Sequence, residues 1–308
     1  MNAGTAVRRV CLVVAACLTL AGCPPDRQET SGTHATSEQP PAEAATGIQV
    51  KGSDTLLQLG QRCAEVYQQS QPEVQIAVTG GGSGTGIAAL IDGNCDIANA
   101  SRQMKDEETK TAQEAGVNPR QYVVAYDGIA VIVNKQNRLE QLTMPQLSDI
   151  FAGRMKSWRE VGGEDAEIVL LIRDTASGTH VYFKEAVVNQ GRKLGLEYAA
   201  EALPQVSNQA IHDVVMQNAQ AIGYIGLGYL DDAVKTVKVV GEEGGEAVAP
   251  SIASVKDGSY PISRALYNYT NGEPSGHVRD YLSWCLGNEG QAIVEEIGFV
   301  PGEAVSEG

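Results

Sequence analysis

Three short turns of this chain place glycine, serine and threonine where an apolar run ends and a helical pattern begins. They are residues 52–55 (GSDT), 80–86 (GGGSGTG) and 173–180 (RDTASGTH). From residue 47 onward, short apolar runs alternate with stretches whose apolar residues recur every three or four positions, which are the patterns of strands and helices. This alternation predicts an α/β fold with a largely parallel sheet, built as two similar halves.

The three turns are candidate anion sites. A helix N-terminus leaves several backbone N–H groups unpaired and carries a partial positive charge, so an anion can bind there directly. Glycine lets the backbone approach closely, and serine and threonine add hydroxyl donors. Each turn alone can be explained by helix capping. Three of them, one with Arg173, favour a shared anion site, because the carboxyl ends of parallel strands meet in one crevice.

The glycine run at residues 80–86 does not have the spacing of a nucleotide-binding or nucleophile motif. A dinucleotide fingerprint needs glycine where Ile87 stands, and a Walker loop needs lysine at that same position. A nucleophile elbow needs glycine where Thr85 stands. The run therefore favours a free anion over a nucleotide.

The first 46 residues are typical of an exported, lipid-anchored protein. Two arginines precede an apolar run that is too short for a stable membrane span. Residues 20–23 (LAGC) have the lipobox pattern, which predicts a signal peptide over residues 1–22 and acylation of Cys23. The alternative is an ordinary secretory signal followed by a chance cysteine. Residues 23–46 lack large apolar side chains and are expected to form a flexible tether, which would hold the protein at the cell membrane, facing the periplasm or the cell exterior.

Charge limits the partners that we expect. The formal charge is −15, and it would become −17 without residues 1–22, which contain two arginines and no acidic residue. Such an acidic surface argues against nucleic acid. It does not exclude a small anion, because charges beyond about 8 Å are largely screened at physiological salt and the local donors decide.

Cysteines and histidines give no sign of a metal site. The histidines are far apart and no cysteine spacing is that of a zinc site, so we expect no metal and no other cofactor. Without the signal peptide and a lipidated Cys23, the remaining cysteines are Cys63, Cys95 and Cys285. An oxidising compartment permits one bridge. The sequence favours Cys63 and Cys95 as the pair, without deciding whether the bridge forms.

The order of several motifs resembles that of the periplasmic phosphate-binding proteins, the substrate-binding components of the phosphate ABC importer. The similarity covers about residues 47–303, and its motifs are KGSDTLLQL, VTGGGSGTGI, DIANASR, YDGIAVIVN, IRDTASGTH and LSWCLGNEGQAIVEEIGFVP. This resemblance implies a type II periplasmic binding protein fold, in which two α/β lobes are joined by two crossover strands and the ion lies in the cleft between them. It implies lobe I over residues 47–128 and 258–308, and lobe II over residues 129–257.

The resemblance also implies which residues bind phosphate. Arg173 would be the charged clamp, and the other ligands would supply hydroxyl or backbone N–H donors or line the cleft. These candidates are Thr55, Leu56, Ser83, Ser101, Arg102, Ser177, Gly178 and Thr179.

Arg102 departs from the better-known pattern of the family. Other members have an aspartate there, which accepts the proton of hydrogen phosphate, and arginine is found in one branch. Asp127 or Asp54 is our candidate for the missing acceptor. We prefer Asp127 because it follows a strand expected to cross between the lobes. Alternatively, Asp127 only orients Arg102 or caps a turn.

We therefore expect a monomeric protein that binds inorganic phosphate with high affinity and delivers it to an ABC permease. One alternative is another tetrahedral oxyanion, sulfate or molybdate. A phosphatase is a further alternative, but it would need a metal pair or an activated nucleophile. Ser83 and Ser177 have no histidine or lysine partner evident in the sequence, so we expect no enzymatic activity.

Overall fold

The computed structural model describes residues 47–302. The signal peptide, the lipidation of Cys23 and the tether all concern residues outside this range. None of the helices within it has the length and apolarity needed to cross a bilayer.

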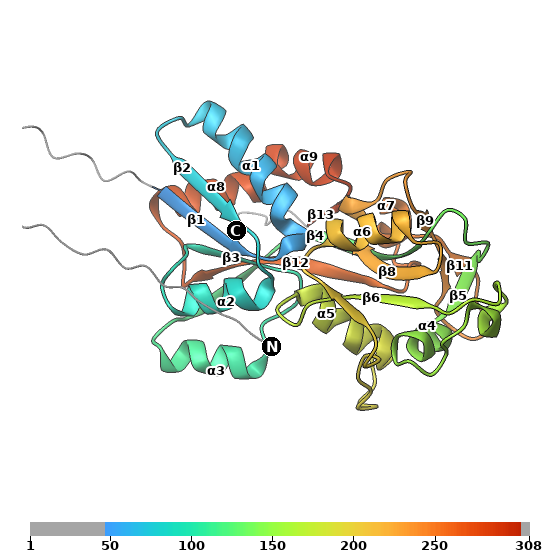
Figure 1. Ribbon diagram of the computed structural model, residues 1–308. Helices are drawn as coiled ribbons and strands as arrows, with labels where there is room; N and C mark the ends of the chain where they lie inside the picture. The colour runs from blue at the N-terminus through green and yellow to red at the C-terminus, as the bar shows by residue number, and fades with distance from the viewer. Residues whose placement is uncertain (1–46, 303–308) are drawn as a thin grey trace, which may run out of the picture. The chain divides into compact units, whose positions relative to one another are not determined.

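A ten-stranded sheet runs through the described part of the chain, in the order β2-β1-β3-β12-β4-β8-β6-β7, with β9 and β13 paired to β4 (Figure 1). Its strands are β1 (Gly47–Gly52), β2 (Gln75–Thr79), β3 (Ile97–Ala100), β4 (Pro119–Val133), β6 (Val169–Arg173), β7 (Leu203–Gln205), β8 (Ala221–Gly226), β9 (Lys235–Thr236), β12 (Ser263–Asn271) and β13 (Val300–Pro301). A second sheet, in the order β11-β10-β5, contains β5 (Gln141–Thr143), β10 (Lys238–Val240) and β11 (Ala247–Val248).

The large sheet is mixed, whereas the sequence predicted a largely parallel one. The prediction holds within each half, since β1 is parallel to β2 and β3, and β6 is parallel to β7 and β8. It fails at the centre, where β12 and β4 are antiparallel to each other and to their outer neighbours β3 and β8. The reason is that these two central strands carry the chain between the halves rather than forming strand–helix–strand units.

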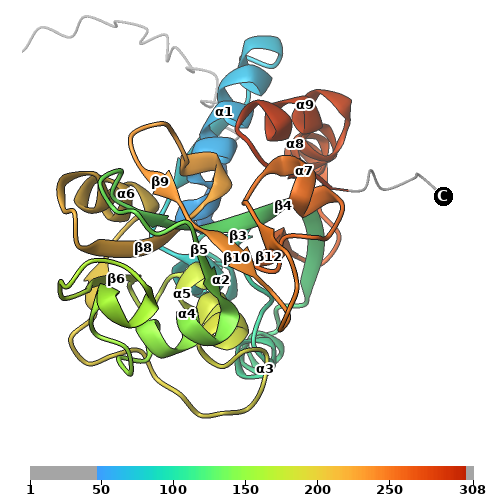
Figure 2. The same cartoon turned by 90° about the vertical axis from the view of Figure 1, so that its right-hand side faces the viewer.

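Strand β4 joins the two halves. Residues 119–128 pair with β12, and residues 129–133 pair with β8. The second stretch (IAVIV) is completely buried, as expected for a β-branched run covered on both faces. Figure 2 shows β4 running from β8 toward the helices α8 and α9. Asp127 and Gly128 lie where the pairing partner changes, so this point of the sheet belongs to both halves.

Helices cover both faces of the sheet. In the first half, α1, α8 and α9 lie on one face and α2 and α3 on the other (Figure 1). The helices are α1 (Leu57–Ser70), α2 (Ser83–Ile91), α3 (Asp106–Glu114), α4 (Met144–Phe151), α5 (Gly178–Phe183), α6 (Asn208–Gln217), α7 (Ile252–Lys256), α8 (Gly276–Leu286) and α9 (Asn288–Glu296). Shorter or irregular turns are η1 (Asp54–Leu56), η2 (Trp158–Val161), η3 (Lys184–Val188, a π-helix) and η4 (Leu227–Tyr229).

The buried apolar residues form three clusters. The largest contains residues 129–133, further residues between Leu139 and Ile262, and Val300. The other two belong to the first half, one under α1 and α8 and one under α2. The lobe boundaries at residues 128 and 258 stay a prediction.

The favoured Cys63–Cys95 pair is wrong in this structure. Cys63, Cys95 and Cys285 are free. Cys63 belongs to the cluster under α1, and Cys95 to the cluster under α2. Because these helices lie on opposite faces of the sheet (Figure 1), nearness along the sequence does not bring the two thiols together.

Candidate functional site

The three turns lie against one another at the centre of the described chain. Thr55 Oγ1 and Thr179 Oγ1 are 3.0 Å apart, although 124 residues separate them in the sequence. The backbone N–H of Gly84 donates to the carbonyl of Ala176 at 3.1 Å. Each turn follows a strand and opens a helix, so the parallel strands within each half place them at one edge.

One buried serine from the second turn and one from the end of β3 lie against Gly178. Ser83 Oγ and Ser101 Oγ are 3.2 Å apart, and the Ser101 N–H donates to Ser83 Oγ at 2.9 Å. A Cβ atom at Gly178 would lie 2.3 Å from Ser83 Oγ and 2.6 Å from Ser101 Oγ. No side chain fits there, so glycine lets the start of α5 approach these hydroxyls.

Hydrogen bonds that involve Ser177 and Leu56 already engage some of the N–H groups that could bind an anion. Ser177 is the N-cap of α5, and its Oγ accepts hydrogen bonds from the N–H groups of Thr179 and His180, at 3.2 and 3.3 Å. Its own hydroxyl proton stays available for an anion. The Leu56 N–H donates to the Ser53 carbonyl at 3.1 Å, so this donor is already engaged.

Arg264, at the start of β12, connects several of these groups and was missed by the sequence analysis. Its Nη2 donates to Asp127 Oδ2 at 3.1 Å and to Thr179 Oγ1 at 2.9 Å. The same nitrogen lies 3.3 Å from Thr55 Oγ1, and Nη1 donates to the Ser101 carbonyl at 2.8 Å. The guanidinium is buried, and its Nε has no hydrogen-bond partner within residues 47–302. The available signal was a single arginine at the start of a predicted strand.

Asp127 is completely buried and is the partner of Arg264 across the β4–β12 pair. Its Oδ1 also accepts a hydrogen bond from the Leu227 N–H at 3.0 Å. Burial raises the pKa of Asp127, although Arg264 and the Leu227 N–H oppose this. Burial also lowers the pKa of Arg264, which Asp127 opposes. Asp127 therefore orients Arg264 rather than Arg102, with which it makes no hydrogen bond in the described residues.

Arg173 is buried at the end of β6 and faces Asp54, our second acceptor candidate. Its Nη1 is 3.3 Å from Asp54 Oδ2. Asp54 Oδ2 also accepts hydrogen bonds from the backbone and side-chain nitrogens of Asn208, each at 3.0 Å. The other guanidinium nitrogens of Arg173 donate to the carbonyls of Gln205 and Val206, at 3.3 and 3.0 Å. Asp54 thus ties the first turn to Arg173 and to the start of α6.

Arg102 is the candidate that lies at the edge of this cluster. Its guanidinium makes a bidentate ion pair with Glu108, with both N–O distances at 2.7 Å. Burial alone would raise the pKa of Glu108, but hydrogen bonds from Arg102 and the Lys105 N–H outweigh it and lower the pKa. Arg102 and Arg264 both line a polar cavity of about 490 Å³ beside the turns. Arg102 therefore lies on the wall of this cavity, with its charge balanced by Glu108.

The site thus combines hydroxyl and N–H donors with three arginines, each paired with a carboxylate. Such a set can replace the hydration shell of a small oxyanion with charge-assisted hydrogen bonds. Residues 47–302 contain no group of three or more histidine, cysteine or acidic side chains placed to hold a metal ion.

Comparison with known proteins identifies the class. Residues 36–289 match the PBP superfamily domain, so this chain is a substrate-binding protein with the type II periplasmic binding fold. It is 33% identical over 267 residues to the phosphate-binding protein PstS of Pseudomonas aeruginosa, with 81% of each chain covered. It is 31% identical to PstS of Staphylococcus saprophyticus, with 81% of this chain and 78% of that one covered.

Solved structures agree with this class. One is a Clostridium perfringens protein assigned as a phosphate ABC transporter substrate-binding protein and solved with bound phosphate. Its TM-score is 0.74 at 32% identity, with 83% of this chain and all of that chain covered. An ABC-type phosphate transport receptor from Vibrio cholerae has a TM-score of 0.67 at 28% identity, with the same coverage. The chain belongs to the PstS family of phosphate-binding proteins, which confirms the family resemblance seen in the sequence.

Proposed function

We propose that this protein binds inorganic phosphate outside the cytoplasm, in the cleft between its lobes, and delivers it to an ABC permease. The PstS relatives and the phosphate-bound structure from Clostridium perfringens support this function. The observation that carries it is the buried guanidinium of Arg264, which lies within hydrogen-bond range of hydroxyl groups from the first and third turns, one from each half of the chain. Members of the family act outside the cytoplasm, and we assign this chain to a phosphate import system with an ABC permease.

We assign the phosphate donors to the turns and the charge to buried arginines. Anion burial is costly unless every oxygen finds hydrogen bonds and the charge is balanced. The hydroxyls of Thr55, Ser83, Ser101 and Thr179 already lie within hydrogen-bond range of one another or of Arg264. The remaining members of the proposed set are Leu56, Arg102, Asp127, Arg173, Ser177, Gly178 and Arg264.

Asp127 is our acceptor for the proton of hydrogen phosphate. It lies in the same hydrogen-bonded group as Thr55 and Thr179 through Arg264. A sulfate ion has no proton to donate at neutral pH, so it would make no hydrogen bond to this carboxylate and would be repelled by its charge. Such repulsion disfavours the wrong ligand. Phosphate is therefore preferred over sulfate.

A binding role fits the serines better than a phosphatase role does. Ser83 and Ser101 contact each other, and Ser177 caps a helix. An activated serine would instead hydrogen-bond to a general base. His180, at the end of the third turn, directs its Nδ1 to the Arg173 carbonyl at 2.7 Å. We therefore assign these hydroxyls as donors to an ion that leaves chemically unchanged.

Isothermal titration of the mature protein with phosphate, arsenate and sulfate tests this function. We expect phosphate to bind at micromolar concentration or tighter and sulfate to bind much more weakly. Equal affinity for sulfate and phosphate would contradict the selectivity. Hydrolysis of a phosphomonoester would contradict the assignment as a binding protein, provided that the rate per milligram of protein stays constant through further purification.

We also propose that acylated Cys23 anchors a monomeric protein to the membrane. The lipobox pattern at residues 20–23 supports this anchor. Metabolic labelling with a fatty acid should mark the native chain and not Cys23→Ser, which should appear in the soluble exported fraction. Labelling of both chains would contradict the anchor.

A further inference from the structure

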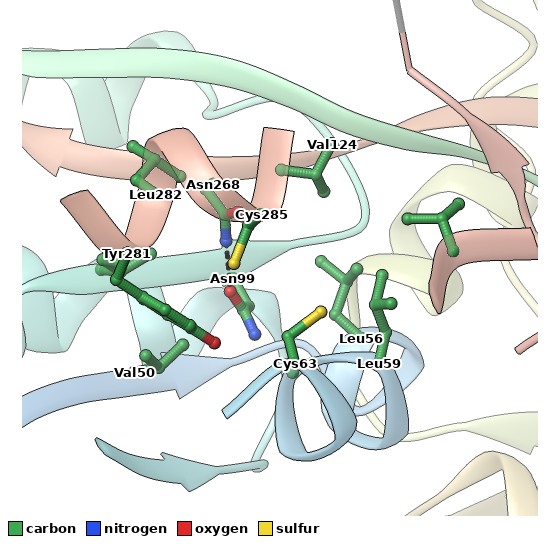
Figure 3. Close-up of a pocket in the computed structure, with 13 residues that line it drawn as sticks. Val50, Leu56, Leu59, Cys63, Asn99, Val124, Asn268, Tyr281, Leu282 and Cys285 are labelled. Atoms are coloured by element: carbon green, nitrogen blue, oxygen red, sulfur yellow. Dashed lines mark hydrogen bonds between the residues drawn. The ribbon is translucent and has the colours of Figure 1, made fainter. Parts of the chain in front are cut away.

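Two cysteines from distant parts of the sequence line one small cavity. Cys63 lies on α1 and Cys285 on α8, and both border a largely apolar cavity of about 30 Å³. Figure 3 shows the two side chains extending into this cavity from the two helices, with both sulfur atoms on its wall. The cavity gives the two thiols room to change rotamer.

Aromatic packing holds these two helix faces together. Tyr67 lies one helical turn after Cys63, and Tyr281 one turn before Cys285. The Tyr67 ring packs edge-on against Tyr281 at 5.2 Å and against Trp284 at 5.4 Å between centroids. Residues four apart on a helix share a face, so the faces that meet are the faces that carry the two cysteines.

The two cysteines of the pair interact with each other, whereas the third described cysteine lies elsewhere in the fold. Burial raises the pKa of the Cys285 thiol well above its usual value, and interaction with Cys63 raises it further. Cys95 belongs to a different cluster on the other side of the sheet and lies against the Gly86 carbonyl. Exported proteins fold where disulfides form and persist. Cys63 and Cys285 are therefore the pair that the fold brings together in such a compartment.

We propose that Cys63 and Cys285, which are free thiols in this structure, form a disulfide in the exported protein and join α1 to α8. One cysteine, as thiolate, attacks the disulfide of an exported thiol–disulfide oxidoreductase and expels one of its sulfurs. The thiolate of the second cysteine then attacks the resulting mixed disulfide, forms the Cys63–Cys285 bond and expels the other sulfur. The oxidant leaves as a dithiol with the two electrons and two protons.

The bond forms while the chain folds. In the folded domain Cys63 is buried and the Cys285 thiol is held protonated, so neither can readily react with an oxidant. The bridge encloses most of the described chain, and a long closed loop restricts the unfolded ensemble strongly. It links the first helix of the domain to a helix near its end.

Peptide mapping of the exported protein tests the proposal. Free thiols are trapped with N-ethylmaleimide during unfolding, and the chain is digested without reduction. We expect a linked pair of peptides containing Cys63 and Cys285, two hydrogens lighter than their sum, and an alkylated Cys95. Alkylation of both Cys63 and Cys285, or linkage of either to Cys95, would overturn the proposal.

Thermal unfolding with and without dithiothreitol tests whether the disulfide stabilises the fold. The native protein and the matched control Cys95→Ser should unfold at a lower midpoint after reduction. Cys63→Ser and Cys285→Ser should show no shift on reduction. If either variant fails to fold, peptide mapping of the native chain still shows whether Cys63 and Cys285 are linked. An unchanged midpoint in both the native protein and Cys95→Ser would contradict a stabilising bridge.

Discussion

At the scale of single residues, the Arg264–Asp127 pair is the most consequential contact of the site. Both side chains are buried, and their ion pair has an N–O distance of 3.1 Å. Removing one partner of a buried pair leaves an uncompensated charge, which costs about 3–5 kcal/mol. We therefore expect stability and the proposed phosphate binding to depend on the same two side chains.

We predict that Arg264→Ala lowers the free energy of unfolding by about 3–5 kcal/mol and abolishes phosphate binding. Urea unfolding and isothermal titration measure the two effects. The control is Arg279→Ala, which removes an exposed pair with Asp280 and should change stability by less than about 0.5 kcal/mol. Replacing both Arg264 and Asp127 by apolar residues should restore stability without restoring binding. Phosphate binding by Arg264→Ala would show that the guanidinium does not contact the ligand.

Asp127→Asn should change how stability depends on pH. Burial raises the pKa of Asp127 in the folded state above its unfolded value. The carboxyl therefore contributes its full stability below the unfolded pKa of about 4 and loses it as the pH rises through the higher folded pKa. The free energy of unfolding of the native protein, relative to Asp127→Asn, should therefore fall as the pH rises from about 4. Urea titrations across this range measure it, and a difference independent of pH would contradict the prediction.

At the scale of elements, the start of α5 must come very close to the start of α2 and the end of β3. We predict that Gly178→Ala weakens phosphate binding at least tenfold, about 1.4 kcal/mol, because its Cβ would lie within 2.6 Å of two serine oxygens. The matched control is Gly84→Ala, whose nearest neighbour would be the Ala176 carbonyl at an ordinary 3.5 Å. Isothermal titration of both variants tests this. Equal weakening by the two would point to a general loss of packing.

The elements could be read from sequence because their patterns are local, and the convergence of the turns followed from the expected α/β topology. Alternating patterns and Ser/Gly/Thr turns identify where strands end and helices begin, and α2 begins at Ser83 within the predicted turn. Arg264 could not be found in this way. Its role follows from pairing opposite Asp127, 137 residues earlier, in a strand register that no local pattern encodes. The Arg102–Glu108 pair was missed because Glu108 reads as an ordinary solvent-facing helix residue.

At the scale of the whole described chain, side-chain contacts join its two halves. Asp54 in the first half faces Arg173 and accepts two hydrogen bonds from Asn208 in the second. We propose that these contacts favour a closed arrangement of the two halves over an open one. Because an apparent affinity falls with the population of the competent state, they contribute to phosphate affinity without requiring Asp54 to touch the ion.

We therefore predict that Asp54→Asn weakens phosphate binding about tenfold through a shift toward the open state. The radius of gyration from small-angle scattering should exceed that of the native protein without phosphate and match it at saturating phosphate. Asp174→Asn is the matched control, because Asp174 lies 3.6 Å from the same arginine but within the same half, so it should leave both measurements nearly unchanged. If Asp54→Asn lost affinity with an unchanged radius of gyration, Asp54 would instead act at the ligand, as the second candidate acceptor for the phosphate proton. The scattering measurement thus separates a residue that closes the cleft from one that contacts the ion within it.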